Sequence, residues 1–325
     1  MDFQLTEDQQ ALQSGLRAFC DDRYAFENVA LLEKAPLDRD RHRELAEMGV
    51  FSLRLPEAQG GVGLGTAEAV LVFAELGRRV VPGPLLWSHL FAGLVPGAAT
   101  GETIVGGLDR TRSAGSEPLF VEYADGLDTL LVLARDGVRR IDARKLAGHP
   151  IGTPLDPLTP LSHVRELPEG ERVAGPEQAA QLRLEGTLLG AALCLGIAEA
   201  TAELAVEYAK KREQFDRPIA SFQAIKHFAA DMHVRQEMAR AAVYAAGATF
   251  DDPSVGDVVR AVASARVVAG EAAMKNARMC IQIYGGMGYT WEMPPHYYLK
   301  RAFVLENTLT GGDEACETIA ERIDL

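Results

Sequence analysis

Cysteine is scarce in this chain of 325 residues, and its few cysteines lie far apart. Cys20, Cys194, Cys280 and Cys316 include no Cys-x-x-Cys pair, and the chain is much longer than the small domains that depend on disulfides. We therefore expect reduced, buried thiols. Neither a structural zinc site nor a redox dithiol is indicated.

Long hydrophobic runs are also lacking. The longest uncharged, mainly apolar run is Gly186 to Ala198, which is thirteen residues long, whereas a bilayer requires about 20. It is typical of a buried helix. The first residues, Met1 to Asp8, contain neither a basic segment nor an apolar segment of the kind found in secretory signals. These observations predict a cytoplasmic protein without a membrane partner.

Basic residues are too few for a nucleic-acid-binding protein. Lysine and arginine together number 33 against 46 aspartates and glutamates, which gives a net charge of −13. A surface with this bias repels phosphate backbones and anionic lipid headgroups. The charge balance therefore argues against nucleic acid and membrane surfaces as partners. Hydrophobic residues make up 47% of the chain, which fits an ordinary folded protein of two or three domains and excludes disorder.

Several common catalytic and nucleotide-binding signatures are absent. Gly60 to Gly63 and Gly285 to Gly288 do not connect a predicted strand to a helix in a βαβ unit, and no Gly-Lys-Ser/Thr sequence exists, so Rossmann and P-loop sites are excluded. The chain has no pair of Glu-x-x-His repeats for a di-iron centre and no Gly-x-Ser-x-Gly motif. His227 and His233 are six residues apart, so they lie on different faces of a helix.

The hydrophobic pattern divides the chain into three regions, namely a helical region over 1–95, a small β region over 96–177 and a helical bundle over 178–325. In the first region Thr6 and Gln9 form a capping-box pattern, and a helix over Ala67 to Leu76 is predicted to stop at Gly77. The fold class is therefore mainly α with a small β middle domain.

The pattern also predicts individual elements. Short β-type runs are expected at 103–105, 119–122, 130–133 and 138–141, and the Pro- and Gly-rich stretch 149–176 is expected to cross the surface without regular structure. Long helices are expected up to Lys211, over 222–250 and over 255–279, with a second N-terminal helix at 41–49 and a glycine-rich loop at 56–65. Three long helices with short connections favour an antiparallel bundle.

The segment between the first two long helices is the most informative for function. Arg212 lies near a helix C-terminus, where a cation is favourable, but a guanidinium group also binds phosphate. Phe215, Phe222 and Gln223 offer aromatic and amide contacts to a purine. The residues alone leave both a structural and a ligand-binding role open.

Three motifs occur along this chain. They are Pro56-Glu57-x-x-Gly60-Gly61-x-Gly63, the pattern Arg-x-x-Phe-Gly-x-x-Ile/Leu-x-x-x-Gln at Arg212, Phe215, Ile219 and Gln223, and Gln-x-x-Gly-Gly-x-Gly-Tyr at Gln282, Gly285, Gly286, Gly288 and Tyr289. They resemble the motifs of the acyl-CoA dehydrogenase family and occur in the family's order. Asp216 replaces the family's usual glycine. The motifs span most of the chain.

The resemblance implies an N-terminal helical domain, a middle β-domain, a C-terminal four-helix bundle and FAD as the cofactor. It also implies that subunits pair through their bundles. The residues that would contact the ADP half of an FAD held mainly by a neighbouring subunit are Arg212, Gln214, Phe215, Phe222, Gln223, Gln282, Gly285 and Gly286. A cationic fork, aromatic rings and close-approach glycines are suited to a diphosphate and an adenine.

The reaction implied by the resemblance is α,β-desaturation of an acyl-CoA thioester, in which a carboxylate removes the α-proton and the flavin accepts the β-hydrogen. The family's usual base position falls on Leu309, which cannot accept a proton. Some members carry the base at a position that falls on Gly186, so the adjacent Glu185 is a candidate for the base. The alternative interpretation is that Glu185 is a solvated residue at the start of a helix. Glu306 is expected to be structural or exposed. The catalytic base is therefore unassigned.

The β region also departs from the family. The strand and segment that usually cover the flavin ring have no clear counterparts around 110–117 or 119–123. This combination resembles the short subunits of heterotetrameric acyl-CoA dehydrogenases of bacterial steroid catabolism. It predicts an α2β2 assembly with a full-length homologue, an acyl-CoA substrate with a sterol-derived acyl chain, and an electron-transfer acceptor. The alternatives are a self-sufficient homotetramer with a displaced carboxylate base and a non-catalytic scaffold or acyl-CoA-binding subunit.

Overall fold

The computed structural model describes residues 4–112 and 118–323, and the described chain forms two compact units. Unit 1 contains the chain up to Phe26, Thr66–Val81 and the chain from Thr187 onward. Unit 2 contains Glu27–Gly65 and Pro82–Gly186. Part of the segment expected to lack the family's flavin-covering strand, residues 113–117, lies outside the described residues.

Unit 2 combines short helices with two small sheets. Its helices are α2 (Val29–Lys34), α3 (Arg39–Glu47) and α5 (Leu85–Leu90), followed by the first part of α6 (Pro176–Lys211). Its strands are β1 (Val105–Asp109), β2 (Leu119–Glu122), β3 (Thr129–Ala134), β4 (Gly137–Asp142), β5 (Gly148–Pro150), β6 (Leu161–Val164) and β7 (Glu171–Ala174). One sheet has the order β1-β3-β4-β7, with β1 parallel to β3, and the other has the order β2-β6-β5. The small β region predicted from the sequence is confirmed.

A core between these strands holds unit 2 together. Leu130, Ile141, Val121 and Val164 are buried in one hydrophobic cluster. The hydroxyl of Tyr123 donates to Leu158 O at 2.7 Å and accepts from Gly83 N at 2.9 Å, so its polar end is satisfied within the core. Such pairing is what allows a buried tyrosine to stabilise a small sheet.

The stretch 149–176 is not the irregular surface segment that we predicted. It contains β6 and β7, and β6 pairs with β2 from Leu119↔Val164 to Glu122↔Leu161. Asp156 is buried and accepts hydrogen bonds from Leu158 N and Thr159 Oγ1. The prediction is wrong because four-residue strands flanked by prolines and glycines carry too little periodicity to be recognised.

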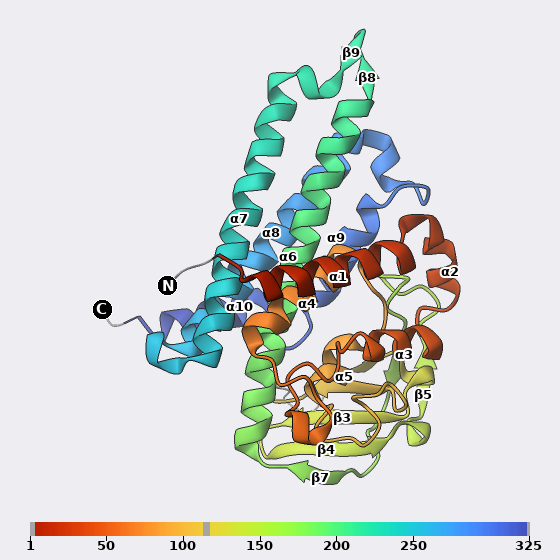
Figure 1. Cartoon of the computed structure of the whole chain (residues 1–325). Helices are drawn as coiled ribbons and strands as arrows, with labels where there is room; N and C mark the ends of the chain where they lie inside the picture. The colour runs from red at the N-terminus through yellow and green to blue at the C-terminus, as the bar shows by residue number, and fades with distance from the viewer. Residues whose placement is uncertain (1–3, 113–117, 324–325) are drawn as a thin grey trace. The chain divides into compact units, whose positions relative to one another are not determined.

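Unit 1 is almost entirely helical. Its helices are α1 (Glu7–Arg23), α4 (Thr66–Arg78), the rest of α6, α7 (Gln223–Asp251), α8 (Val258–Tyr284), α9 (Pro295–Glu306) and α10 (Gly312–Ala320). The helices α6, α7 and α8 run side by side, and α9 and α10 pack on α8 (Figure 1). The predicted capping box is present at α1, where Thr6 Oγ1 accepts from Gln9 N and the Gln9 side chain accepts from Thr6 N.

Gly77 does not end its helix as we predicted, because α4 continues to Arg78. A β-carbon at Gly77 would overlap the backbone of Leu193, and one at Gly196 would overlap the backbone of Ala74. These two glycines therefore allow α4 and α6 to approach closely. The close approach, rather than a left-handed cap, explains the glycine at position 77.

Helix α6 is long and apolar enough, by length and composition alone, to cross a membrane. However, 72% of its most apolar window is buried within the protein. Leu188, Leu189, Ala191, Leu195 and Ile197 are all buried. The run Gly186 to Ala198 is therefore core, as the sequence predicts.

Candidate functional site at the hairpin end of the bundle

A small β-hairpin connects α6 and α7 and forms the end of the bundle (Figure 1). Strand β8 (Glu213–Gln214) pairs with β9 (Arg217–Pro218) in the register Glu213↔Pro218 and Gln214↔Arg217. The two turn residues, Phe215 and Asp216, have φ of 55° and 61°. A tight turn with positive φ at both positions matches the twist of the strands, although it normally favours Asn and Gly. The sequence therefore holds a phenylalanine and an aspartate in a conformation with some strain.

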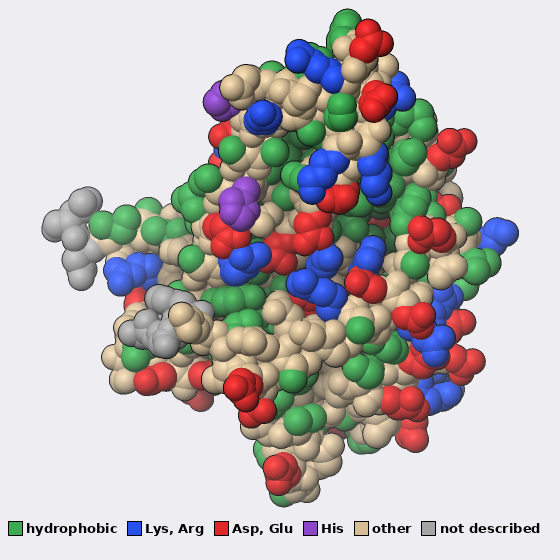
Figure 2. All heavy atoms as spheres, turned by 45° about the horizontal axis from the view of Figure 1, so that its top comes forward, with side chains coloured by type: hydrophobic (Ala, Val, Ile, Leu, Met, Phe, Trp, Pro, Cys, Tyr) green, Lys and Arg blue, Asp and Glu red, His purple; other side chains and the backbone are tan. Residues whose placement is uncertain are grey.

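Arginine and phenylalanine side chains are exposed on this hairpin. Within the described chain Arg212 makes no ion pair, and the Phe215 side chain is 85% exposed. The guanidinium carbon of Arg217 lies 4.2 Å from the centre of the Phe222 ring, and the Phe215 ring meets Phe222 edge-on at 6.1 Å. Figure 2 shows acidic, basic and apolar side chains close together near the top of the view, where this end of the bundle lies.

The C-terminus of α8 lies at the same end of the bundle as the hairpin. The Tyr284 ring stacks on Tyr208 with centroids 3.9 Å apart, and Tyr208 is one helical turn before Arg212. Both tyrosines belong to a cluster that also contains Ile219, Ile225 and Met232. The turn η7 (Gly285–Tyr289) begins directly after Tyr284. The second and third sequence motifs, far apart in the chain, therefore converge here.

The glycine turn leaves open space beside its backbone. Gly285 has φ of 61°, and β-carbons placed on Gly285 and Gly286 would meet no atom within 4 Å. Gln282 and both glycines are exposed, as are Arg212, Gln214, Phe215 and Gln223, whereas Phe222 is half-buried. All eight residues predicted to contact a dinucleotide are thus found at one end of unit 1. Their donors, rings and open backbone are chemically suited to a diphosphate and an adenine.

Two hydroxyl groups meet where α6 enters unit 1. Thr187 Oγ1 donates to Thr310 Oγ1 at 2.9 Å, and both threonines are buried. Thr187 follows Gly186 in the chain, and Thr310 follows Leu309, so each threonine is the neighbour in sequence of one of the two base positions considered from the sequence. Leu309 is half-buried with φ of 58°. Neither Gly186, Thr187, Leu309 nor Thr310 offers a carboxylate.

A buried arginine holds the turn that carries Leu309. Arg266 is 1% exposed, and it donates from Nε to Thr310 O at 2.7 Å and from Nη2 to Leu305 O at 2.9 Å. Its Nη2 also lies 3.0 Å from Glu306 Oε2, and Glu306 Oε1 accepts from Gly312 N at 2.7 Å. Glu306 is therefore a structural residue, in agreement with the prediction. Its carboxylate binds the Arg266 guanidinium group and the backbone N–H of Gly312.

Glu185 is buried in unit 2 rather than solvated at a helix start. Its Oε1 lies 2.5 Å from Arg54 Nη1 and 3.6 Å from His89 Nε2. The other nitrogen of His89, Nδ1, donates to Val50 O at 2.8 Å, because a carbonyl can only accept. Burial opposes ionisation of Glu185, but the neighbouring His89 and Arg54 side chains together hold its pKa below the usual value. A carboxylate stabilised as an anion in this way is a poor proton acceptor.

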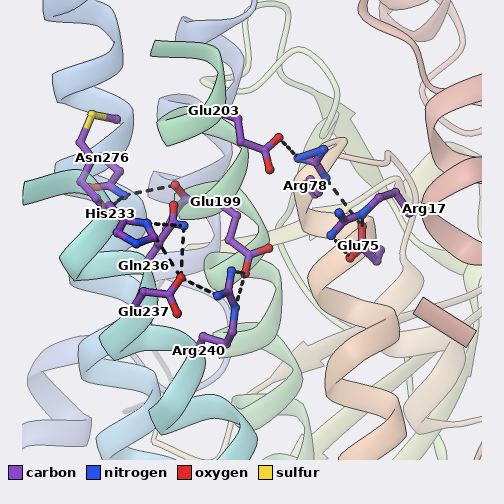
Figure 3. A network of polar contacts seen from close by, with 12 residues as sticks. Arg17, Glu75, Arg78, Glu199, Glu203, His233, Gln236, Glu237, Arg240 and Asn276 are labelled. Carbon is purple, nitrogen blue, oxygen red and sulfur yellow. Dashed lines mark hydrogen bonds and ion pairs between the residues drawn. The ribbon is translucent and has the colours of Figure 1, made fainter. Parts of the chain in front are cut away.

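A second set of buried charges in unit 1 was not anticipated (Figure 3). Arg17 binds Glu75 through two bonds, Nε to Oε2 at 2.9 Å and Nη2 to Oε1 at 2.7 Å. Arg240 binds Glu199 Oε1 through Nε at 3.0 Å and Nη2 at 2.7 Å. Burial and the nearby Glu75 carboxylate raise the pKa of Glu199. The signal in the sequence was a glutamate within an apolar stretch of each of two helices, Glu75 in α4 and Glu199 in α6.

The histidines and cysteines do not form a site. His227 and His233 are exposed. Within the described residues there is no group of three or more His, Cys, Asp or Glu side chains that could hold a metal ion. Cys20, Cys194 and Cys280 are buried free thiols, as predicted, whereas Cys316 is exposed.

Comparison with known proteins identifies the family. The model of the acyl-CoA dehydrogenase N-terminal domain matches residues 6–100, and the model of the C-terminal domain matches residues 179–323. The chain is 34% identical to acyl-CoA dehydrogenase IpdE2 of Mycobacterium tuberculosis, over 84% of this chain and 83% of that protein. The chain belongs to the acyl-CoA dehydrogenase family.

Solved structures of acyl-CoA dehydrogenases share the fold. A chain of the ChsE4–ChsE5 complex from Mycobacterium tuberculosis superposes with a TM-score of 0.87 and 26% identity, covering 100% of both chains. A chain of the Tcur3481–Tcur3483 steroid acyl-CoA dehydrogenase has a TM-score of 0.83 and 23% identity, covering 97% of both chains. The predicted fold, with its helical N-terminal part, small β region and C-terminal bundle, is confirmed.

Acyl-CoA dehydrogenases are flavin-dependent oxidoreductases with FAD as cofactor, as we predicted. The hairpin end of this acyl-CoA dehydrogenase passes the chemical test for part of that cofactor. It offers cationic forks without ion pairs, aromatic rings and a glycine turn with open space beside it. The expected base positions, Gly186 and Leu309, and the threonines that follow them carry no carboxylate.

Proposed function

We propose that this chain is a subunit of a flavin-dependent acyl-CoA dehydrogenase and contributes one edge of an FAD site that it shares with a partner subunit. The observation that carries the proposal is the contrast between two places in unit 1. The hairpin end offers exposed, unpaired arginines, whereas two hydroxyl groups meet beside the expected base positions. A chain of this kind can bind the cofactor yet needs a carboxylate from elsewhere.

In this proposal the residues of the hairpin end hold the ADP half of FAD. Arg212 donates to the diphosphate, Gln214 and Gln223 offer amide contacts, and Phe215 and Phe222 provide apolar faces. Gln282, Gly285 and Gly286 allow the dinucleotide to approach the backbone at the end of α8. When bound, FAD supplies the redox chemistry by accepting the β-hydrogen of the acyl thioester as hydride.

The catalytic base in this proposal comes from the partner. Glu185 is held by Arg54 and His89, and Glu306 is held by Arg266 and Gly312 N. Removal of an α-proton requires a carboxylate that is free to accept it, and a general base contributes roughly 10²- to 10⁴-fold in rate. These contacts favour the shared site over the self-sufficient homotetramer with a displaced base.

The nature of the partner and the substrate also belongs to the proposal. We infer an α2β2 assembly with a longer member of the same family, which the similarity to a chain of the ChsE4–ChsE5 complex supports. The substrate is an acyl-CoA thioester, and one protein of the same fold is described as a steroid acyl-CoA dehydrogenase. A bulky, sterol-derived acyl chain and an electron-transfer acceptor complete the proposal.

The decisive experiment is purification of the tagged chain from its own host, followed by measurement of flavin and of the proteins that accompany it. We expect a longer family member in the complex and bound FAD that bleaches with acyl-CoA. In the Arg212→Ala variant the complex should persist but lose most of its flavin. Arg260→Ala is the matched control, because Arg260 is exposed in the first turn of α8, at the opposite end of that helix.

Two outcomes would contradict the proposal. A yellow chain that is purified alone and bleaches with acyl-CoA would favour the self-sufficient homotetramer. A complex whose flavin content is unchanged by Arg212→Ala would favour a scaffold or acyl-CoA-binding subunit without a role at the cofactor.

A further inference from the structure

Arg217 is a charged residue of the hairpin strands to which the family motif assigns no role. It lies on β9, directly across from Gln214 on β8. Its guanidinium group packs on the Phe222 ring at 4.2 Å. Within the described residues it makes no ion pair, although Asp216 is its neighbour in the chain and Glu213 lies on the facing strand. Apart from the contact with the Phe222 ring, its charge has no partner within the described residues.

The stacking contact fixes the orientation of this charge. A guanidinium group that packs on an aromatic ring keeps its N–H donors available in its own plane, because the contact uses its face. Holding the group on Phe222 also removes part of the conformational freedom that a long side chain would otherwise lose on binding a ligand. Arg217 is thus positioned before any ligand arrives.

The hairpin register places Arg217 near Arg212. Arg212 precedes Gln214 by two residues, so both belong to the same side of an alternating strand, and Arg217 pairs with Gln214. Diagonal neighbours in an antiparallel pair have β-carbons about 7 Å apart, which is within reach of long side chains. Ile219 N also donates to Arg212 O at 2.8 Å, so the pairing continues to Arg212. Glu213 faces the other side, opposite Pro218.

We propose that Arg217 is a second phosphate-binding residue and grips the diphosphate of the dinucleotide together with Arg212. The inference rests on the proposed function and deepens it by assigning a specific residue to the diphosphate. Two guanidinium groups match the two negative charges of a dinucleotide diphosphate, and each can donate two parallel hydrogen bonds. Two acids adjoin the pair in the chain: Asp216 precedes Arg217, and Glu213 follows Arg212 but faces the other side of the hairpin.

The test is FAD rebinding to the purified assembly after its flavin has been removed. In the Arg217→Met variant, which keeps an apolar chain on Phe222 but loses the charge, we expect FAD to bind about 10- to 100-fold more weakly. ADP should compete less well with FAD by a similar factor, whereas adenosine, which has no phosphate, should compete as before. Arg260→Met is the matched control for the loss of one surface charge and should bind FAD like the wild type.

Salt dependence gives a second readout that a merely structural arginine would not change. Each phosphate contact made by a cation steepens the fall in affinity with salt, so Arg217→Met should show a shallower fall than the wild type. Arg217→Lys should lie between the two, because lysine keeps the charge but lacks the fork. If the Arg217→Met variant does not assemble, Arg217→Gln also tests whether loss of the charge weakens FAD binding, because its planar amide can pack on the Phe222 ring.

The outcomes separate this inference from the function on which it rests. If Arg217→Met or Arg217→Gln binds FAD and ADP like the wild type while Arg212→Ala loses them, Arg217 has no role at the phosphates and the shared site stands. If adenosine is weakened as much as ADP, Arg217 contacts the base and the proposal is wrong. If Arg212→Ala also binds normally, the proposed function itself fails.

Discussion

Arginines in unit 1 occur in two contrasting environments. In the polar cluster of Figure 3, Arg17, Arg78 and Arg240 are paired with Glu75, Glu199, Glu203 and Glu237 between α1, α4, α6 and α7. At the hairpin end, Arg212 and Arg217 are exposed and have no carboxylate partner within the described residues.

The difference separates the charges that are paired within the fold from those that we propose bind a ligand. A buried carboxylate is costly unless it is paired and hydrogen-bonded, so the cluster charges must be satisfied for unit 1 to fold. An exposed arginine carries no such requirement, and a surface ion pair would contribute little to stability. We therefore expect changes in the cluster to alter stability, and changes at the hairpin end to alter FAD binding.

The largest effect should follow from loss of the Arg17–Glu75 pair. Glu75 is 1% exposed and receives two hydrogen bonds from Arg17. In Arg17→Met the carboxylate remains buried, with Arg78 Nε still 3.7 Å away, so we expect unfolding to become easier by about 2 to 3 kcal/mol. Urea denaturation measures this. The flavin content of the folded variant should match that of the wild type. If the variant instead lost flavin without losing stability, the cluster would affect FAD binding, contrary to this expectation.

A smaller, pH-dependent effect is expected at Glu199. Its pKa is raised above the ordinary value of 4.5 in the folded protein, so the folded state binds more protons than the unfolded state. The stability that this provides is complete below pH 4.5 and is lost as the pH rises through the folded pKa. A pKa difference of one corresponds to about 1.4 kcal/mol. Glu199→Gln cannot ionise and should therefore gain stability relative to the wild type as the pH rises.

Denaturation between about pH 5 and pH 8 tests this sign. The cluster also contains His233, Glu237 and Tyr244, so the comparison needs a variant that removes a nearby but exposed carboxylate. Glu203→Gln serves this purpose, because the Glu203 side chain is 54% exposed. A constant difference between Glu199→Gln and the wild type across this range would show that Glu199 is already ionised.

The smallest effect on stability should come from the hairpin turn. Asp216 has φ of 61°, which costs a residue other than glycine roughly 1 kcal/mol, so Asp216→Gly should stabilise the protein by about that amount at most. Thermal denaturation measures this change. Asp216→Asn separates the effect of backbone strain from the effect of the charge, because asparagine tolerates the same backbone conformation but lacks the negative charge. If both variants bind FAD more tightly, the carboxylate opposes the diphosphate; if neither does, Asp216 is remote from it.

Much of the hairpin end was predictable from the sequence because its signals are local. Arg212 and Phe215 lie in one short motif between two long helices, and Gly285 and Gly286 follow a third helix. The strands β5 to β7 were missed because short strands flanked by prolines and glycines give little periodicity. Gly77 was misinterpreted because its role depends on Leu193, which is distant in the chain.

The sequence by itself determined the family, the helical bundle and the identity of the residues at its hairpin end, because these depend on helical periodicity and short motifs. Only the tertiary structure decided which charged side chains are paired within the fold. It placed Thr187 against Thr310 and buried Glu185 between Arg54 and His89, while Arg212 and Arg217 were left exposed. The physical reason is that the state of a charged side chain depends on its burial and its partners, which lie far away in the sequence.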